Sequence, residues 1–266
     1  MKIGFIGTGN MGGALARAAA KGGHTLLLAN RTPAKAAALA KELGGTVCPN
    51  VEAAETAELL FLGVKPQGLA GLAGELAPVL QARKGNAPVV VSMATAVTLR
   101  ELDAMLGGGL PLIRIMPNTP PAVGAGTILY AAQNVTDAQL NAFRAVLAQA
   151  GLLLPLPEAQ IDAASAISGC GPAFCFQFAD ALALGGVRAG LSYPDACRLA
   201  AQTMLGAAEM LLQGGEAPDV LKMRVCSPAG TTIEGVLALE QGGFSYTVQN
   251  AVTAAYRRTV EMTRKG

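Results

Sequence analysis

Six residues near the start of the chain repeat glycine with a defined spacing: Gly7-Thr8-Gly9-Asn10-Met11-Gly12. They follow a short apolar run that predicts a strand (2–6) and open an Ala-rich stretch that predicts a helix (10–22). In that setting the first glycine allows a tight turn, the second lets a pyrophosphate approach the backbone, and the third lets helix and strand pack closely. The motif therefore predicts a dinucleotide-binding loop, and a glycine-rich turn without a ligand is the alternative. The contacts expected here are Ile6, Gly7, Thr8, Gly9, Asn10 and Met11.

The residues after the second predicted strand (25–30) distinguish between two cofactors. Enzymes that use NAD usually carry Asp or Glu about 20 residues after the glycine motif, where the carboxylate holds the ribose 2′-hydroxyl. This chain has Asn30-Arg31-Thr32 instead. Arg31 can pair with a 2′-phosphate through two hydrogen bonds, and the Thr32 hydroxyl can add another at the next helix start. All three are expected to bind NADPH, with NADH possible but weaker; the alternative for Arg31 is a solvated turn residue.

Further loops are expected at the same edge of the sheet. The fourth predicted strand (59–64) ends in Gly63-Val64-Lys65-Pro66, and two later strands (88–93 and 111–116) end in loops of their own. Ligands of parallel sheets bind outside the carboxyl ends of the strands. The three loops together therefore predict a nicotinamide pocket, with Gly63, Val64, Lys65 and Pro66 as cofactor contacts.

Strand and helix signals alternate as far as Pro157 and then change. Near-continuous apolar strands between helices indicate a parallel sheet covered on both faces. After Pro157 only helical periodicity remains, interrupted by glycine and proline. We expect an α/β fold: an N-terminal Rossmann-type, doubly wound, mostly parallel sheet in residues 1–156, and a C-terminal all-helical domain in residues 157–266.

The composition narrows the possible partners. Hydrophobic residues make up 52% of the chain and charged residues 14%, with a formal net charge of +2 and no basic stripe, which argues against nucleic acid. The uncharged stretch 163–179 contains glycine and proline and is shorter than the ~20 residues of a membrane span. No secretion signal is recognisable, so a cytoplasmic protein without a membrane partner is expected. The only histidine is His24, and the five cysteines lack a Cys-x-x-Cys spacing, so no metal site is expected.

Five segments, in this order, resemble the pyrroline-5-carboxylate reductase family: FIGTGNMGGA, GVKPQ, IRIMPNTP, ISGCGPAF and CSPAGTTIEG. They span nearly the whole chain, and the last two are the specific ones, because dinucleotide folds in general lack them. The resemblance implies NADPH-dependent reduction of 1-pyrroline-5-carboxylate to L-proline, the last step of proline biosynthesis. It also implies a helical domain that pairs with a second subunit, as a dimer at least or as a decamer of five dimers.

The resemblance also implies roles for individual residues. Its substrate loop corresponds to Ser227 through Thr232, its cofactor-proximal asparagine to Asn50, and its nicotinamide loop to Met93, Ala94 and Thr95. The chain departs from the family at several positions. Ala229 replaces a frequent glycine, Cys170 a frequent serine, Phe174 a tyrosine, and Arg224 an asparagine of some members.

The break Cys226-Ser227-Pro228-Ala229-Gly230 between helical segments suits the implied substrate, which carries a carboxylate next to a cyclic imine. A new helix starting at Thr231 or Thr232 presents unpaired N–H groups to an anion. We expect the N–H groups of Gly230, Thr231 and Thr232, with the Ser227 hydroxyl, to bind the carboxylate. Thr232 is also the expected catalytic residue, because its hydroxyl can orient the ring nitrogen or relay its proton. An ordinary helix–helix turn is the alternative.

Two other functions fit parts of the sequence. A β-hydroxyacid dehydrogenase shares the two-domain plan but typically uses a lysine on the first long helix of the second domain, and residues 101–221 contain no lysine. An NADP-sensing binding protein would keep the fold without the reaction. The intact CSPAGTT segment favours an enzyme with a substrate.

Overall fold

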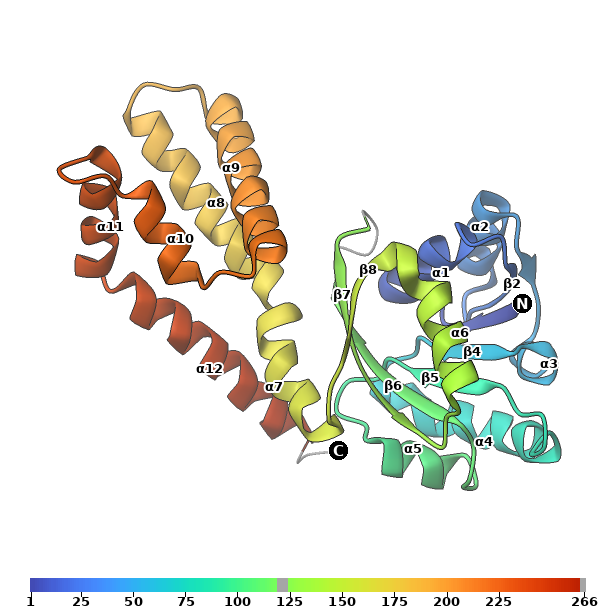
Figure 1. Cartoon of the computed structure of the whole chain (residues 1–266). Coiled ribbons are helices and arrows are strands. Elements are labelled where there is room, and N and C mark those ends of the chain that lie inside the picture. The colour runs from blue at the N-terminus through green and yellow to red at the C-terminus, as the bar shows by residue number, and fades with distance from the viewer. Residues whose placement is uncertain (119–123, 264–266) are drawn as a thin grey trace. The chain divides into compact units, whose positions relative to one another are not determined.

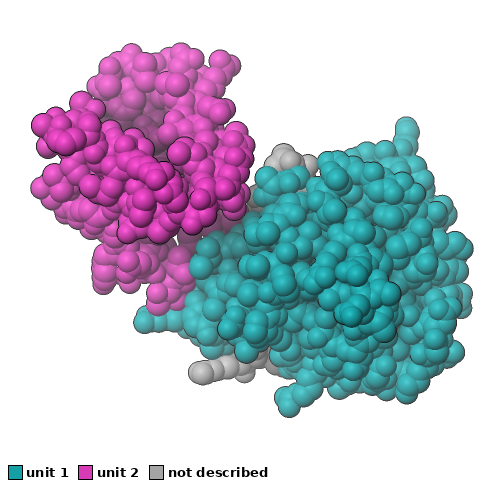
Figure 2. Space-filling view, in the orientation of Figure 1, with its two compact units in different colours: residues 1–169, 256–266 teal, residues 170–255 magenta. Residues whose placement is uncertain are grey.

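The computed structural model describes residues 1–118 and 124–263 of the chain (Figure 1). Two compact units can be distinguished by their internal contacts (Figure 2). The first comprises Met1–Gly169 with Tyr256–Gly266, and the second comprises Cys170–Ala255. The domain limits 1–156 and 157–266 refer to parts that fold independently, and they remain a prediction.

The first unit is built on an eight-stranded sheet with the order β3-β2-β1-β4-β5-β6-β7-β8. Neighbouring strands are parallel except for β6 and β7, which pair antiparallel. The prediction of a doubly wound, mostly parallel sheet is confirmed. The strands are β1 (Lys2–Ile6), β2 (Thr25–Ala29), β3 (Thr46–Val47), β4 (Leu59–Leu62), β5 (Val89–Ser92), β6 (Leu112–Pro117), β7 (Gly126–Gln133) and β8 (Gly151–Pro155).

Helices cover both faces of this sheet because successive side chains of each strand point to opposite faces and both faces are apolar. The helices of this unit are α1 (Asn10–Ala20), α2 (Pro33–Leu43), α3 (Asn50–Thr56), α4 (Pro66–Ala82), α5 (Leu99–Met105), α6 (Asp137–Leu147) with the 3-10 turn η2 (Ala148–Ala150), α7 (Glu158–Ser168) and the end of α12 (Phe244–Thr263). Ile3 and Phe5 of β1 pack with α1, α2 and α6, whereas Ile6 packs with α3, α4, α5 and α7 on the other side.

The second unit is all helical, as expected. It consists of α8 (Gly171–Arg188), α9 (Tyr193–Gly214), α10 (Pro218–Val225), α11 (Thr231–Gln241) and the first part of α12 (Phe244–Thr263). Its helices bury little apolar surface within one chain. Ala183 is buried in α8, Ala196 and Ala200 are buried in α9, and among the described residues α10 and α11 contain no buried side chain.

The helical stretch Glu158–Arg188 contains an 18-residue window with a mean hydropathy of 1.3 and is, by length and composition alone, long and apolar enough to cross a membrane. The uncharged residues 163–179 are shorter than a membrane span, as expected, and the helical stretch is longer because it also contains charged residues on both sides. α8 begins three residues after α7 ends, and Asp162 and Asp180 border the uncharged segment on these two helices.

Candidate active site

The glycine motif forms the turn between β1 and α1 in the way its spacing predicts. Gly7 has a positive φ of +98°, and a Cβ there would lie 2.5 Å from the carbonyl oxygen of Gly63. A Cβ on Gly12 would overlap the carbonyl oxygen of Gly7. A Cβ on Gly9 would have no described atom within 4 Å. Gly7 and Gly12 are therefore required by the fold, whereas Gly9 leaves open space in front of the helix, as a bound pyrophosphate needs.

The motif lies at the point where the strand order reverses. β1 pairs with β2 on one side and with β4 on the other, so the chain winds away from β1 in both directions. The N–H of Gly7 donates to the carbonyl oxygen of Ala29 at 2.8 Å, and the N–H of Gly63 donates to that of Ile6 at 2.7 Å. These bonds tie the loops after β1, β2 and β4 together at the usual ligand-binding edge of such sheets.

Thr8 provides a direct test of whether these residues fit a dinucleotide. The residue is 8% exposed, and its hydroxyl has no hydrogen-bond partner among the described residues. Leaving a buried hydroxyl unpaired costs about 1–3 kcal/mol. A phosphate oxygen at the helix start would accept this hydrogen bond, so the site fits the group.

Asn30 supports the glycine loop from the end of β2. Its side-chain oxygen accepts the N–H of Thr8 at 3.2 Å, and its side-chain nitrogen donates to the carbonyl oxygen of Thr32 at 3.0 Å. The Asn30 side chain thus links the glycine motif to Arg31 and Thr32, which were predicted to bind the 2′-phosphate.

Arg31 and Thr32 keep polar groups available at that segment. Arg31 is exposed and makes no hydrogen bond or ion pair with any residue in the described ranges. Thr32 precedes α2 as its N-cap, yet its hydroxyl makes no capping bond within the part of the chain that is described. A guanidinium, a hydroxyl and a helix N-terminus are thus close in sequence at the end of β2, which suits a phosphate.

The loops after β4 and β5 meet beside the glycine motif. A Cβ on Gly63 would lie 3.4 Å from the sulfur of Met93, and Ala94 is buried with its N–H 3.3 Å from the Ser92 hydroxyl. Lys65 is exposed as the N-cap of α4, and Pro66 opens that helix. Of the predicted pocket, the structure therefore brings together the loops after β1, β4 and β5. Thr119 and Pro120 of the IRIMPNTP segment lie outside the described residues.

Asn50 opens α3 and is held by a residue that the sequence did not suggest. Its side-chain nitrogen donates to both carboxylate oxygens of Glu75, at 3.3 and 3.1 Å. Glu75 lies on α4, 25 residues further along the chain, so periodicity gave no signal for this contact.

The predicted substrate loop is in the second unit. α10 ends before Cys226, a turn follows, and α11 begins at Thr231, one of the two predicted starts. The N–H of Gly230 donates to the carbonyl oxygen of Ser227 at 3.0 Å, which corrects one expectation: this N–H is already used within the turn. The free N–H groups of the first helical turn belong to Thr231, Thr232 and Ile233 instead.

Two residues shape this turn. A Cβ on Gly230 would overlap the Ser227 hydroxyl oxygen, so that hydroxyl would have to rotate away from any larger residue at this position. Ala229 has a φ of +55°, in the left-handed region that favours glycine. The turn thus has the conformation of a glycine-rich loop although one of its residues is alanine. Thr231 and Thr232 are both exposed at its end.

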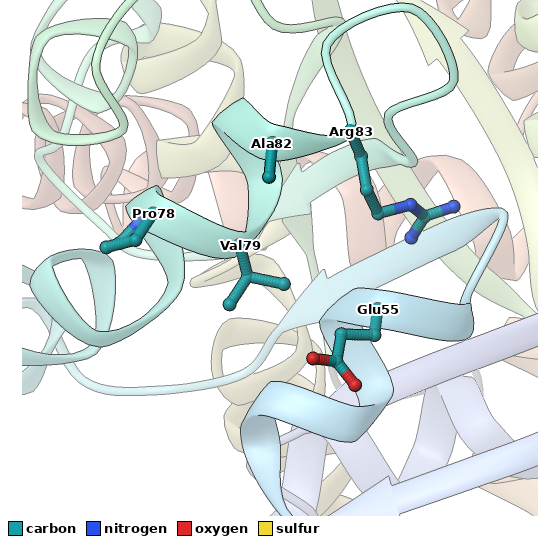
Figure 3. A pocket seen from close by; sticks show the side chains of 5 residues that line it. All are labelled: Glu55, Pro78, Val79, Ala82 and Arg83. Carbon is teal, nitrogen blue, oxygen red and sulfur yellow. The ribbon is translucent and has the colours of Figure 1, made fainter.

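A hollow on the surface of the first unit lies away from this edge (Figure 3). It is lined by Glu55, Pro78, Val79, Ala82 and Arg83, from α3, the second half of α4 and the residue after it. Because α4 begins at the carboxyl ends of the strands, its second half lies toward the opposite edge. The Arg83 guanidinium already donates to the carbonyl oxygen of Ala57 at 3.1 Å, so it closes the end of α3.

Comparisons with known proteins agree with this arrangement. A family model described as pyrroline-5-carboxylate reductase dimerisation matches residues 158–262, and one described as NADP oxidoreductase, coenzyme F420-dependent, matches residues 2–96. The chain is 35% identical to pyrroline-5-carboxylate reductase 3 of Macaca fascicularis, over 99% of this chain and 97% of the relative. It is 41% identical to pyrroline-5-carboxylate reductase of Synechocystis sp., over 81% and 79%.

A solved structure gives the same result. The crystal structure of Plasmodium falciparum pyrroline carboxylate reductase with NADP bound superposes with a TM-score of 0.85 at 30% identity, covering 99% of both chains. The likeness thus extends over the sheet, the helices and the loops that connect them.

Proposed function

The chain belongs to the pyrroline-5-carboxylate reductase family, and from that premise we propose which of its residues carry out the reaction. The reaction is the reduction of 1-pyrroline-5-carboxylate to L-proline by hydride transfer to the cyclic imine, with NADPH as the hydride donor. The observation that carries this assignment is the identity to a reductase of this name along the whole length of both chains.

NADPH is bound at the carboxyl edge of the sheet. The open space at Gly9 accommodates the pyrophosphate, to which the Thr8 hydroxyl donates a hydrogen bond, and Arg31 and Thr32 donate to the 2′-phosphate. The loops at Gly63 to Pro66 and Met93 to Thr95 hold the nicotinamide end. When bound, the cofactor supplies the hydride, and the protein contributes position and charge.

The substrate carboxylate is bound at the start of α11. The free N–H groups of Thr231 and Thr232 point along the helix axis toward the anion, and the Ser227 hydroxyl adds a donor. The Thr232 hydroxyl contacts the ring nitrogen. A protonated imine is already electrophilic at carbon, so hydride addition forms the C–H bond while the C=N π electrons become the nitrogen lone pair. Catalysis is then mostly the alignment of two carbons.

The second unit is completed by another copy of the chain. Many of its apolar side chains are exposed in the monomer, including Phe176 at 72% and Leu212 at 80%, and a dimerisation family model matches this region. We assign the apolar surface of α8, α9, α11 and α12 to that self-association and not to a membrane. A decamer of five such dimers and a cytoplasmic location are part of the same proposal.

The experiment is an assay of purified protein with 1-pyrroline-5-carboxylate, followed by NADPH oxidation and by detection of proline. The expected result is turnover that saturates in both compounds. Turnover of a β-hydroxy acid with NADP and none of the imine would replace this function by that of a dehydrogenase. NADPH binding without turnover of either compound would indicate an NADP-sensing binding protein.

A further inference from the structure

A buried charged cluster joins three elements of the first unit at a place that the proposed site does not use. Arg114 in the middle of β6 is 3% exposed. One of its terminal nitrogens lies 2.6 Å from a carboxylate oxygen of Asp162, and the other lies 3.4 Å from one of Glu158. Both acids are on α7. A buried guanidinium is tolerated only with such partners, so the pairing fixes the position of α7 on the sheet.

The sheet is built to admit this side chain. Arg114 lies between Ile113 and Ile115, which face the opposite core, so its own side chain points to the face that α7 covers. Its neighbours in register are Ser92 on β5 and Ala131 on β7. Both are small, which leaves room for a long side chain between them.

Glu158 extends the cluster to the loop expected at the nicotinamide. The same oxygen that pairs with Arg114 accepts the N–H of Leu99 at 2.6 Å. Leu99 is the first residue of α5 and follows the segment Met93 to Thr98 directly. One carboxylate therefore holds both the end of that loop and the start of α7.

Asn118 holds the other end of α7. Its side-chain nitrogen donates to the carbonyl oxygen of Ser168 at 3.0 Å, and its side-chain oxygen accepts the N–H of Thr127 at 2.8 Å. Asn118 is 7% exposed and directly follows β6. The helix is thus fixed to the sheet at its first turn through Arg114 and at its last residue through Asn118.

We propose that Arg114, Glu158, Asp162 and Asn118 form a clamp on α7 that positions the nicotinamide loop, Met93 to Thr98, for hydride transfer. The clamp makes α7 part of the cofactor-binding unit and ties its start to the nicotinamide loop. These are positioning residues, and the inference rests on the proposed function.

The test uses Arg114→Lys, Asp162→Asn and Asn118→Ala in the full-length protein. Arg114→Lys keeps the positive charge but cannot pair with both carboxylates through separate nitrogens. Asp162→Asn keeps the shape of the side chain and removes its charge. The matched control is Arg17→Lys, because Arg17 and Glu42 form a two-bond pair between α1 and α2 that is exposed and away from the site. A more severe variant, Arg114→Met, leaves two carboxylates unpaired; if it does not fold, the milder variants carry the test.

We expect faster hydrogen exchange in residues 158–168 for the clamp variants and not for the control. Because a displacement of about 1 Å can cost about a hundredfold in rate, we expect kcat/KM for the imine to fall about tenfold to a hundredfold. The single-turnover hydride rate should fall with it, with a larger isotope effect from NADPH deuterated at the transferred position. The Kd of NADPH should stay within about twofold, because the pyrophosphate loop is independent of the clamp.

Three results would overturn the proposal. They are unchanged exchange of α7 in all clamp variants, loosened α7 with an unchanged hydride rate, and a loss of activity that is explained by an equal loss of NADPH affinity. A wild-type protein that does not reduce the imine would refute the proposed function instead. The exchange measurement would then still decide whether the clamp exists.

Discussion

The two compact units differ in how far they bury their own apolar side chains. The first encloses large residues completely: Phe61 and Phe143 are 0% exposed, and the rings of Phe5 and Phe61 stack at 4.6 Å. The second leaves Phe176 and Leu212 in solvent in the single chain. A unit of this composition has too little core of its own. The difference indicates that the first unit completes its core within one chain, whereas the second unit covers its apolar side chains by self-association.

The largest effect is expected from a substitution that prevents the self-association of the second unit. Phe176→Glu places a carboxylate on the exposed apolar face of α8, where burial of an unpaired charge costs several kcal/mol, so self-association should weaken by about a thousandfold or more. Activity should be lost with it, while NADPH still binds. Sedimentation and cofactor titration measure both. The control is Met105→Glu, an exposed apolar position of the first unit at 38%. If Phe176→Glu still forms a dimer of normal strength, the exposed apolar face of α8 does not take part in self-association.

The second prediction separates two glycines of the cofactor half. Gly9→Ala puts a methyl group into the space left for the pyrophosphate, so the Kd of NADPH should rise by about tenfold to a hundredfold, as expected where backbone must approach phosphate closely. Its melting temperature should hardly change, because the new Cβ meets no described atom. Gly12→Ala should instead lower the melting temperature, because its Cβ overlaps the Gly7 carbonyl oxygen. Equal thermal effects of both variants would show that Gly9 is structural.

The sequence predicted the first unit more completely than the clamp within it. Apolar runs and turn residues gave the strands, and the glycine spacing gave the loop, because these depend on local pattern. Helix α5 was not identified, although Thr98 and Glu101 form a capping box whose sequence signature was present. The pairing of Arg114 with α7 spans 48 residues, and no local pattern specifies it. An arginine within an apolar run was the one available signal.

The third prediction concerns the 2′-phosphate. Arg31→Ala removes a charged hydrogen bond that contributes about 1.5–3 kcal/mol, so the KM for NADPH should rise about tenfold or more. Kinetics with NADH should change little, since that cofactor lacks the phosphate. The measurement is a comparison of kcat/KM for the two cofactors. Equal losses would assign Arg31 a structural role and remove the basis for the NADPH preference.

The fourth prediction probes the substrate half without disturbing the dimer. Thr232→Val keeps the shape and removes the hydroxyl, whose loss leaves a partner unpaired at about 1–3 kcal/mol, so kcat/KM for the imine should fall between a few-fold and about a hundredfold. NADPH binding and sedimentation should match the wild type. Thr231→Val is the control, because only its N–H is assigned to the carboxylate. If the two variants lose the same activity, the Thr232 hydroxyl has no contact with the ring nitrogen.

The smallest expected effect concerns the backbone of the substrate turn. Ala229 has a φ of +55°, and an L-residue in the left-handed region costs about 1–2 kcal/mol. Glycine removes this strain, but it also adds about 0.5–1 kcal/mol of backbone entropy to the unfolded chain. Ala229→Gly should therefore change the free energy of unfolding by about 1 kcal/mol or less, on the stabilising side.

Denaturant unfolding of the dimer at fixed protein concentration measures this change, because the second unit unfolds together with its self-association. The imine KM should stay near the wild-type value, since the turn already has the conformation that glycine prefers. A KM that falls several-fold in Ala229→Gly would mean that alanine distorts the carboxylate site. The strain would then act on substrate binding and not on stability, and the departure at Ala229 would set substrate affinity in this chain.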